Sequence, residues 1–158
     1  MKKWYVLYTK PRNENKVISQ LEGLGITAYC PMITTNRQWS DRIKKVSSPL
    51  IPSCIFINSR ESERNLVFQA PGADRYLYWL GKPAIVLYAE IEILQAWLNG
   101  EVKDAKVENL APSEIYTIKD GYFKGKKGVI TEVGKNRLQL VLLNLGIKIT
   151  IARDKIND

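Results

Sequence analysis

The chain has 158 residues, of which 45% are hydrophobic and 25% are charged, and its formal net charge is +8. This composition excludes disordered and fibrous proteins, and the length allows one sizeable core, or a core of about 100 residues plus a small barrel. No stretch approaches the roughly 20 apolar residues that span a bilayer, and the start of the chain lacks a signal peptide. We therefore expect a cytoplasmic protein with no membrane contact.

The basic charge favours a polyanionic partner, because a positive field raises the local concentration of nucleic acid. Solubility alone would explain a charge of +8 equally well. Charge by itself therefore does not decide between these two explanations.

The first segment, Trp4 to Gly25, predicts a strand followed by a helix. Trp4 to Thr9 are aromatic and β-branched, which is typical of a buried strand. After Pro11, which suits a first helical turn, apolar residues recur at helical spacing: Val17, Ile18, Leu21 and Leu24. Three basic residues then lie on or near the exposed turn: Lys10, Arg12 and Lys16.

The segment from Thr34 to Ser48 predicts a protruding hairpin that turns at Ser40 and Asp41. Its basic residues are Arg37, Arg42, Lys44 and Lys45, and they alternate with Trp39 and Ile43. Interleaved aromatic and basic residues favour contact with nucleic acid, whereas a solvated loop is the plainer interpretation.

Pro49 to Ser59 is the most hydrophobic segment, and period two within it sends Phe56 to one face and Ile55 and Ile57 to the other. Pro52 cannot donate to a sheet, so part of the run around Ile51 should stay exposed as an interface. The two cysteines, Cys30 and Cys54, lie in apolar runs and predict buried reduced thiols.

The following 40 residues predict two helices and two strands. Arg60 to Ala70 forms a short helix with Leu66, Val67 and Phe68 inward, and Ala89 to Asn99 forms an amphipathic helix. Strands are expected at Ala73 to Leu80 and at Ala84 to Leu87. The order of elements favours an antiparallel sheet with flanking helices.

Beyond residue 100 the pattern changes. Residues 101–112 show no sustained period and predict a linker. Short β-branched runs separated by glycine then predict strands at 115–118, 128–133, 137–143, 148–152 and 154–156, which would form a small closed or half-closed barrel. The expected fold class is therefore α+β.

Several segments, in this order, resemble the NusG family of bacterial transcription elongation factors. They are WYVLYTKPR, RQWSDRIKKV with PLIPSCIFI, PGADRYLYW with LGKPAIV, and IKDGYFKGKKGVITEV. The chain looks most like the specialised paralogues of the RfaH and UpxY type, and GxFxGxxG at Gly121 to Gly128 matches the KOW motif. The resemblance implies an NGN-like domain at 1–100, a linker at 101–112 and an SH3-like KOW domain at 113–158.

The resemblance also implies a function and its residues. Such a factor would bind the clamp helices of RNA polymerase and the non-template DNA strand, and would promote processive transcription or antitermination of specific operons. The apolar polymerase-binding surface would comprise Tyr5, Tyr8, Ile51, Pro52, Cys54 and Phe56. The DNA-binding surface would comprise Lys10, Arg12, Lys16 and Arg64, beside the basic hairpin. An ordinary core remains the alternative for Tyr5 and Phe56.

Other partners follow from the same resemblance. The KOW domain would bind a ribosomal protein or a termination factor, and the protein would be a monomer. A KOW-type RNA- or ribosome-binding module is the alternative function.

No enzyme is expected. The chain contains no histidine, which excludes imidazole-based catalysis, and its two separated cysteines cannot form a structural zinc site. We therefore expect neither a cofactor nor a metal.

A helix through the KOW segment would carry Gly125 and Gly128 in its interior, each at a cost of about 1 kcal/mol relative to alanine. We therefore expect a resting β-barrel on a flexible linker, with the polymerase-binding face open.

Overall fold

The computed structural model describes residues 1–99, 102–111, 113–114, 117, 129–133 and 136–153. Its N-terminal part is an antiparallel sheet in the order β2-β5-β1-β6. These strands are β1 (Lys3–Thr9), β2 (Thr27–Tyr29), β5 (Cys54–Ser59) and β6 (Ala73–Tyr76), and the short β9 (Ile85–Val86) also pairs with β1. Two hairpins extend from the sheet: β3 (Met32–Gln38) with β4 (Ile43–Pro49), and β7 (Tyr78–Trp79) with β8 (Lys82–Pro83).

Period two along β1 and β5 sends apolar side chains to both faces of this sheet. Leu7, Ile55 and Ile57 belong to one hydrophobic cluster, whereas Val6 and Phe56 belong to another. The division of β5 agrees with the sequence prediction. A sheet that is apolar on both faces needs a cover on each.

Helix α1 (Glu14–Gly23) and the 3₁₀ helix η1 (Glu61–Gln69) cover the Ile55 side. Val17 and Leu21 of α1 and Val67 of η1 are fully buried there. The helix begins three residues after Pro11, so the prediction that Pro11 lies in its first turn is wrong. In η1, Leu66 and Phe68 are exposed by 40% and 45%, which contradicts their predicted inward placement.

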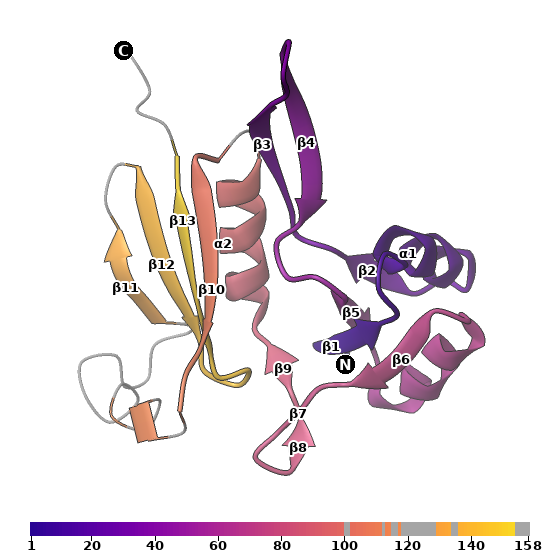
Figure 1. The fold of residues 1–158 in the computed structure, drawn as a ribbon. Coiled ribbons are helices and arrows are strands. Elements are labelled where there is room, and N and C mark those ends of the chain that lie inside the picture. The colour runs from indigo at the N-terminus through magenta and orange to yellow at the C-terminus, as the bar shows by residue number, and fades with distance from the viewer. Residues whose placement is uncertain (100–101, 112, 115–116, 118–128, 134–135, 154–158) are drawn as a thin grey trace.

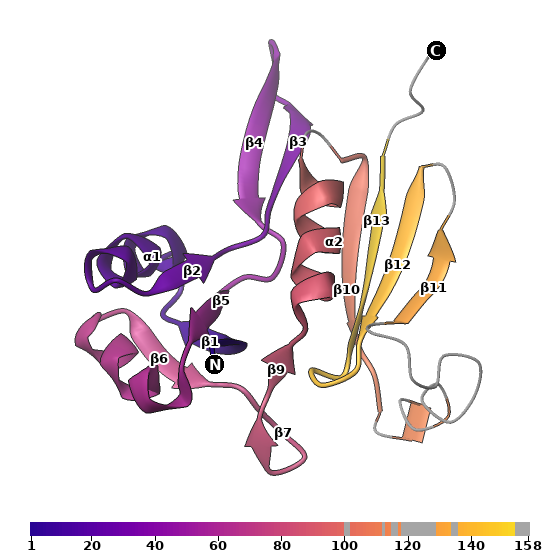
Figure 2. The ribbon, with the colours of Figure 1, turned by 180° about the vertical axis from the view of Figure 1, so that it is seen from behind.

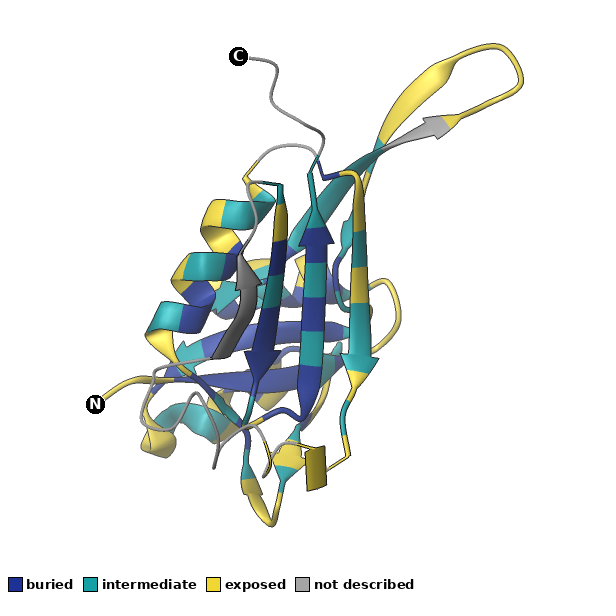
Figure 3. Ribbon diagram, turned by 90° about the vertical axis from the view of Figure 1, so that its left-hand side faces the viewer, coloured by how far each residue is buried: buried dark blue, intermediate teal, exposed yellow. Residues whose placement is uncertain are grey.

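Helix α2 (Tyr88–Leu98) and a second antiparallel sheet cover the Phe56 side. This C-terminal sheet has the order β10-β13-β12-β11 within the described residues, and its strands are β10 (Asp104–Asn109), β11 (Val129–Val133), β12 (Arg137–Leu142) and β13 (Ile147–Ala152). Figures 1 and 2 show α2 standing beside this sheet. Figure 3, viewed from that side, shows the N-terminal sheet behind it.

The C-terminal sheet is amphipathic, and its apolar side faces the rest of the chain. Burial alternates along β13, where Ile147, Ile149 and Ile151 are buried. Leu138 and Leu140 of β12 join them in the same cluster as Phe56 and Leu94 of α2. One hydrophobic core therefore joins the two sheets through α2.

The predicted linker at 101–112 needs correction. Its residues Asp104 to Asn109 form β10, which pairs with β13 over six positions. Sequence pattern missed this strand because charged residues alternate with Ala105 and Val107, and these two are only partly buried at an edge position. The segment is therefore the edge strand of the C-terminal sheet, paired with β13.

Three predictions for the C-terminal part fall wholly or mostly on residues that the structure does not describe. The predicted strand at 154–156, the residues of the GxFxGxxG motif and, apart from Thr117, the predicted strand at 115–118 lie outside the described residues. The strands predicted at 128–133, 137–143 and 148–152 correspond to β11, β12 and β13. The predicted strand at Ala73 to Leu80 is divided into β6 and β7.

The architecture is α+β, with an N-terminal sheet and helices followed by a small antiparallel C-terminal sheet, which confirms the predicted fold class. No helix among the described residues has both the length and the apolar character needed to cross a membrane.

Glu90 at the start of α2 makes the stability of this fold depend on pH. It is 3% exposed, and burial raises its pKa to about 7, although its carboxylate accepts a 2.8 Å hydrogen bond from the Leu87 N–H. Because the folded pKa lies above the unfolded value, the stabilisation is complete at low pH and is lost as pH rises through 7.

We therefore expect Glu90→Gln to stabilise the protein at pH 8.5 by roughly 1–2 kcal/mol, a few degrees in Tm, and to change little at pH 5. Thermal unfolding of both proteins at the two pH values measures this. The exposed Glu92→Gln is the control. An equal shift at both pH values would contradict the assignment.

Candidate functional site

The candidate site is an apolar surface on the N-terminal sheet, which we call the Phe56 face. It consists of Trp4, Val6 and Tyr8 from β1, Cys54 and Phe56 from β5, and Ile51 from the preceding loop. Phe56 is fully buried, Cys54 is 4% exposed, and Tyr8 and Ile51 are partly buried. Thus four of the six residues predicted for an apolar binding surface come together, and a fifth, Pro52, is exposed beside them.

Tyr5 does not belong to this face. It lies in the cluster on the opposite side of the sheet, with its ring edge-on to Tyr76 at 5.9 Å. Alternation along β1 explains the error, because Tyr5 and Tyr8 are three residues apart and so point to opposite faces. For Tyr5 the ordinary-core interpretation describes its position.

The C-terminal sheet covers the Phe56 face. A cavity of about 380 Å³ remains between them, lined on one side by Val6, Tyr8 and Ile51 and on the other by Leu145, Gly146 and Ile147, among others. The expectation of an open face is therefore wrong. The physical reason is the row of inward leucines and isoleucines on β12 and β13, which would otherwise lie in water.

Polar contacts also tie the C-terminal sheet to α2. Arg153 donates from Nε to the Trp97 carbonyl at 3.0 Å and from Nη2 to the Ala96 carbonyl at 2.6 Å. Its guanidinium lies 4.6 Å from the centre of the Trp97 ring. These carbonyls belong to the last turn of α2, where a cation is also favoured by the helix dipole.

A second set of contacts connects the loop between β12 and β13 to the segment that precedes α2. Asn144 donates from Nδ2 to the Ile85 carbonyl at 3.1 Å. Gly146 has φ of +65° and packs so closely on Trp79 that a Cβ there would come within 2.6 Å of the indole ring. Only glycine satisfies both the backbone conformation and the contact.

The thiols of Cys54, on this face, and Cys30 are protonated at neutral pH and therefore unreactive. Burial, followed by the proximity of Cys30, raises the pKa of Cys54 to about 12, and burial raises the pKa of Cys30 to about 11. Both are free and buried, as predicted from sequence. No group of three or more potential metal-ligating side chains occurs in the described part of the chain.

Lys10, Arg12 and Lys16 are all exposed in or next to the β1–α1 turn. Arg12 has φ of +64°, and the turn is held by hydrogen bonds from Lys10 N to the Gly72 carbonyl and from Asn13 N to the Lys10 carbonyl. A Cβ on Gly72 would come within 2.7 Å of Val17, so this glycine lets the turn approach the sheet. These contacts hold the backbone of the turn that carries Lys10 and Arg12.

The other predicted basic residues lie elsewhere. The β3–β4 hairpin, which extends away from α1 (Figure 1), exposes Arg42, Lys44 and Lys45. Arg37 lies in β3, and its side chain is not among those that the structure describes. The hairpin turns at Ser40 and Asp41 as predicted, with Trp39 N donating to the Arg42 carbonyl at 2.7 Å. Arg64 on η1 is half-buried, 5.5 Å from the centres of both the Tyr5 and Tyr76 rings.

Sequence reasoning missed four functional candidates. Trp4 and Val6 follow from period two along β1 once Tyr8 is assigned to this face, so the sequence contained the signal for them. Trp79 and Gly146 come into contact from distant segments, and no local sequence pattern pairs them.

The tip of the β3–β4 hairpin exposes two large apolar side chains, Trp39 by 54% and Ile43 by 67%.

Comparison with known proteins relates the chain to one family. Residues 2–95 match the family model described as transcription termination factor nusG. The chain is 26% identical over 151 residues to the transcription termination/antitermination protein NusG of Rickettsia bellii, covering 88% of this chain and 78% of that protein. A solved structure titled "Domain interaction in Thermotoga maritima NusG" matches with 17% identity and a TM-score of 0.40, covering 98% of both chains.

The contact between Gly146 and Trp79 yields a matched test. We expect Gly146→Ala to destabilise the protein by about 1–3 kcal/mol more than Gly25→Ala does, because only the first adds a clash. Gly25 also has positive φ, +82°, but nothing lies within 4 Å of its would-be Cβ. Urea denaturation of both variants measures the difference, and equal losses would show that backbone conformation alone matters at Gly146.

Proposed function

The chain belongs to the NusG family of transcription termination and antitermination factors, and from this premise we propose that it binds the clamp helices of RNA polymerase through the Phe56 face. Members of this family are not enzymes and act on transcription. The C-terminal sheet covers the Phe56 face in the free protein and leaves it when polymerase binds. We further propose that the chain is a specialised paralogue of the RfaH and UpxY type that promotes processive transcription of specific operons.

One observation carries this proposal: the Phe56 face and the inner side of the C-terminal sheet belong to a single hydrophobic cluster. The sheet and an external partner therefore compete for the same surface. The partly buried residues Tyr8 and Ile51 and the exposed Pro52 at its rim give a partner a first point of contact. An apolar helix pair suits such a surface because helix faces fill shallow apolar grooves.

Competition of this kind sets the apparent affinity. If only a fraction f of the protein has its C-terminal sheet released, the measured Kd exceeds the intrinsic Kd by the factor 1/f. A docking free energy of about 3 kcal/mol would raise Kd roughly 150-fold. Binding would then favour complexes that supply a further attachment, which suits a factor that acts on selected operons.

The further attachment that we propose is the non-template DNA strand. Lys10, Arg12 and Lys16 form the first basic surface, and the hairpin cations with Trp39 form the second. Trp39 is exposed enough to stack on an unpaired base, while neighbouring cations bind phosphate. Arg64 lies over the Tyr5 and Tyr76 rings, and we assign it below to a cavity rather than to this surface.

For the C-terminal residues 113–158 we keep the proposal of a KOW domain that binds a ribosomal protein or termination factor. We propose that this domain begins at β10, because β10 pairs with β13 of the C-terminal sheet. Release of this sheet would free the Phe56 face for RNA polymerase and the KOW domain for its own partner in one step.

Two substitutions should change binding of an isolated clamp-helix coiled coil in opposite directions. Tyr8→Ala removes a ring from the Phe56 face and should weaken binding roughly 10- to 100-fold. Arg153→Ala removes the contacts to Trp97 and Ala96, loosens the C-terminal sheet, and should strengthen binding about tenfold.

Fluorescence anisotropy with a labelled coiled coil measures both, and Lys103→Ala is the control because Lys103 lies outside the Phe56 face. Weaker binding by Arg153→Ala would exclude the covering role of the C-terminal sheet, whereas unchanged binding by Tyr8→Ala would exclude the Phe56 face.

DNA contact by the β1–α1 turn should be electrostatic. Neutralising Lys10, Arg12 or Lys16 singly to glutamine should each reduce the slope of log affinity against log salt by about one unit for single-stranded DNA. Titration at several salt concentrations gives the slopes, with Lys103→Gln as the matched control. A residue whose loss leaves the slope unchanged does not contact phosphate.

A further inference from the structure

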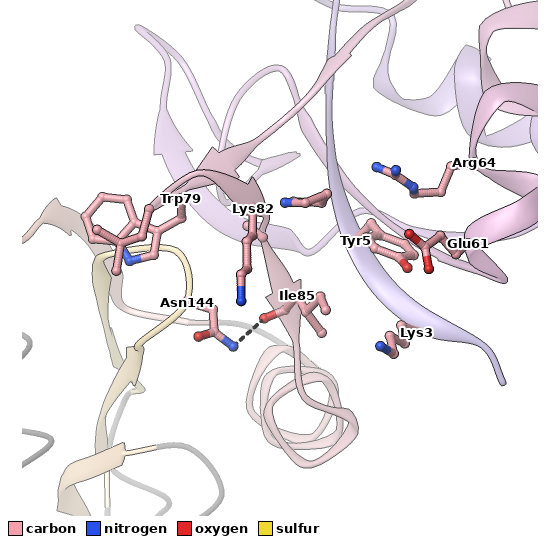
Figure 4. A pocket seen from close by; sticks show the side chains of 11 residues that line it. Lys3, Tyr5, Glu61, Arg64, Trp79, Lys82, Ile85 and Asn144 are labelled. Atoms are coloured by element: carbon pink, nitrogen blue, oxygen red, sulfur yellow. Dashed lines mark hydrogen bonds between the residues drawn. The ribbon is translucent and has the colours of Figure 1, made fainter.

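A second cavity, of about 530 Å³, has Trp79 as a lining residue in common with the cavity at the Phe56 face. It is lined by the start of β1, by η1, by the β7–β8 hairpin and by Asn144 of the C-terminal sheet (Figure 4). Its volume falls within the roughly 300–1,000 Å³ of small-molecule sites. The proposed function does not use it.

The cavity is positively charged. Lys3, Arg64 and Lys82 line it, and Glu61 is the one carboxylate among its described lining residues. None of the three cations forms an ion pair with a carboxylate of the described residues. Cations that gather around a cavity without acidic partners attract a compact anion.

Arg64 is the most buried of the three cations. Its guanidinium lies over both the Tyr5 and Tyr76 rings, and its carbonyl accepts a 2.8 Å hydrogen bond from the Tyr76 hydroxyl. The buried Nε has no hydrogen-bond partner. Because Nε is buried, a phosphate in the cavity would bind the Nη donors of this planar guanidinium.

The opposite wall is aromatic and polar. Trp79 lines the cavity and is fixed by its contact with Gly146. Asn144 is oriented by the bond from Nδ2 to the Ile85 carbonyl, which leaves its Oδ1 as an acceptor (Figure 4). An indole offers a surface for a planar ring, and an amide oxygen accepts from a ring amino group or a sugar hydroxyl.

From cations on one side and an indole with an amide on the other, we propose that this cavity binds a nucleoside phosphate, with its phosphates at Lys3, Arg64 and Lys82 and its base at Trp79. The same chemistry is supplied by a free nucleotide or by the end of a nucleic-acid strand. Because Asn144 and the Gly146 contact come from the C-terminal sheet, the site is complete only while that sheet is docked.

Isothermal titration of the full-length protein with ADP, pyrophosphate and adenosine tests this. We expect ADP to bind at least tenfold more tightly than either fragment. Lys3→Gln and Lys82→Gln change exposed side chains and should each weaken ADP binding by about tenfold. Lys103→Gln, which does not line the cavity, should leave it unchanged.

Competition by a six-nucleotide oligothymidylate assigns the source of the ligand. Displacement of ADP that depends on Lys82 assigns the cavity to a strand end, and absence of displacement assigns it to a free nucleotide. No ADP binding at 1 mM, equal binding of ADP and pyrophosphate, or equal losses from Lys82→Gln and Lys103→Gln would each overturn the proposal.

Discussion

Burial of the apolar side of the C-terminal sheet is the interaction on which the rest of this structure depends. Leu140 and Ile149 are fully buried against the cluster that contains Phe56 and Leu94. Each such side chain contributes about 1.5–3 kcal/mol when removed from water. Without this cover, α2 and the N-terminal sheet would present a continuous apolar surface, which a soluble monomer rarely exposes.

Under the proposed function, the same interaction places the C-terminal sheet and the clamp helices of RNA polymerase in competition for one surface. Most of the contact is apolar and therefore non-directional, so a helix pair can replace the sheet without matching it bond for bond. Directional contacts are few and peripheral: Arg153 on Trp97, Asn144 on Ile85, and Gly146 on Trp79. These contacts set the position of the sheet, and small changes in them should shift the balance between covered and open states.

Local pattern predicted most of the fold and only part of the site. The strand at Phe56, the hairpin turn at Ser40 and Asp41, and the β-structure of the C-terminal leucine-rich segment all follow from period and turn chemistry. The β10 edge strand and the covered Phe56 face depend on pairings between distant segments, such as Asp104 with Ala152, which no local window contains. Tyr5 was misplaced because family resemblance was given more weight than alternation along β1.

The contact between Gly146 and Trp79 tests the covered state most directly. In the free full-length protein we expect nuclear Overhauser effects between the Gly146 α-protons and the Trp79 indole protons, with a ring-current shift of those α-protons. Addition of the polymerase clamp-helix coiled coil should abolish both signals. A free protein that shows neither signal, or signals that persist unchanged in the complex, would contradict the proposal that the C-terminal sheet covers the polymerase-binding face.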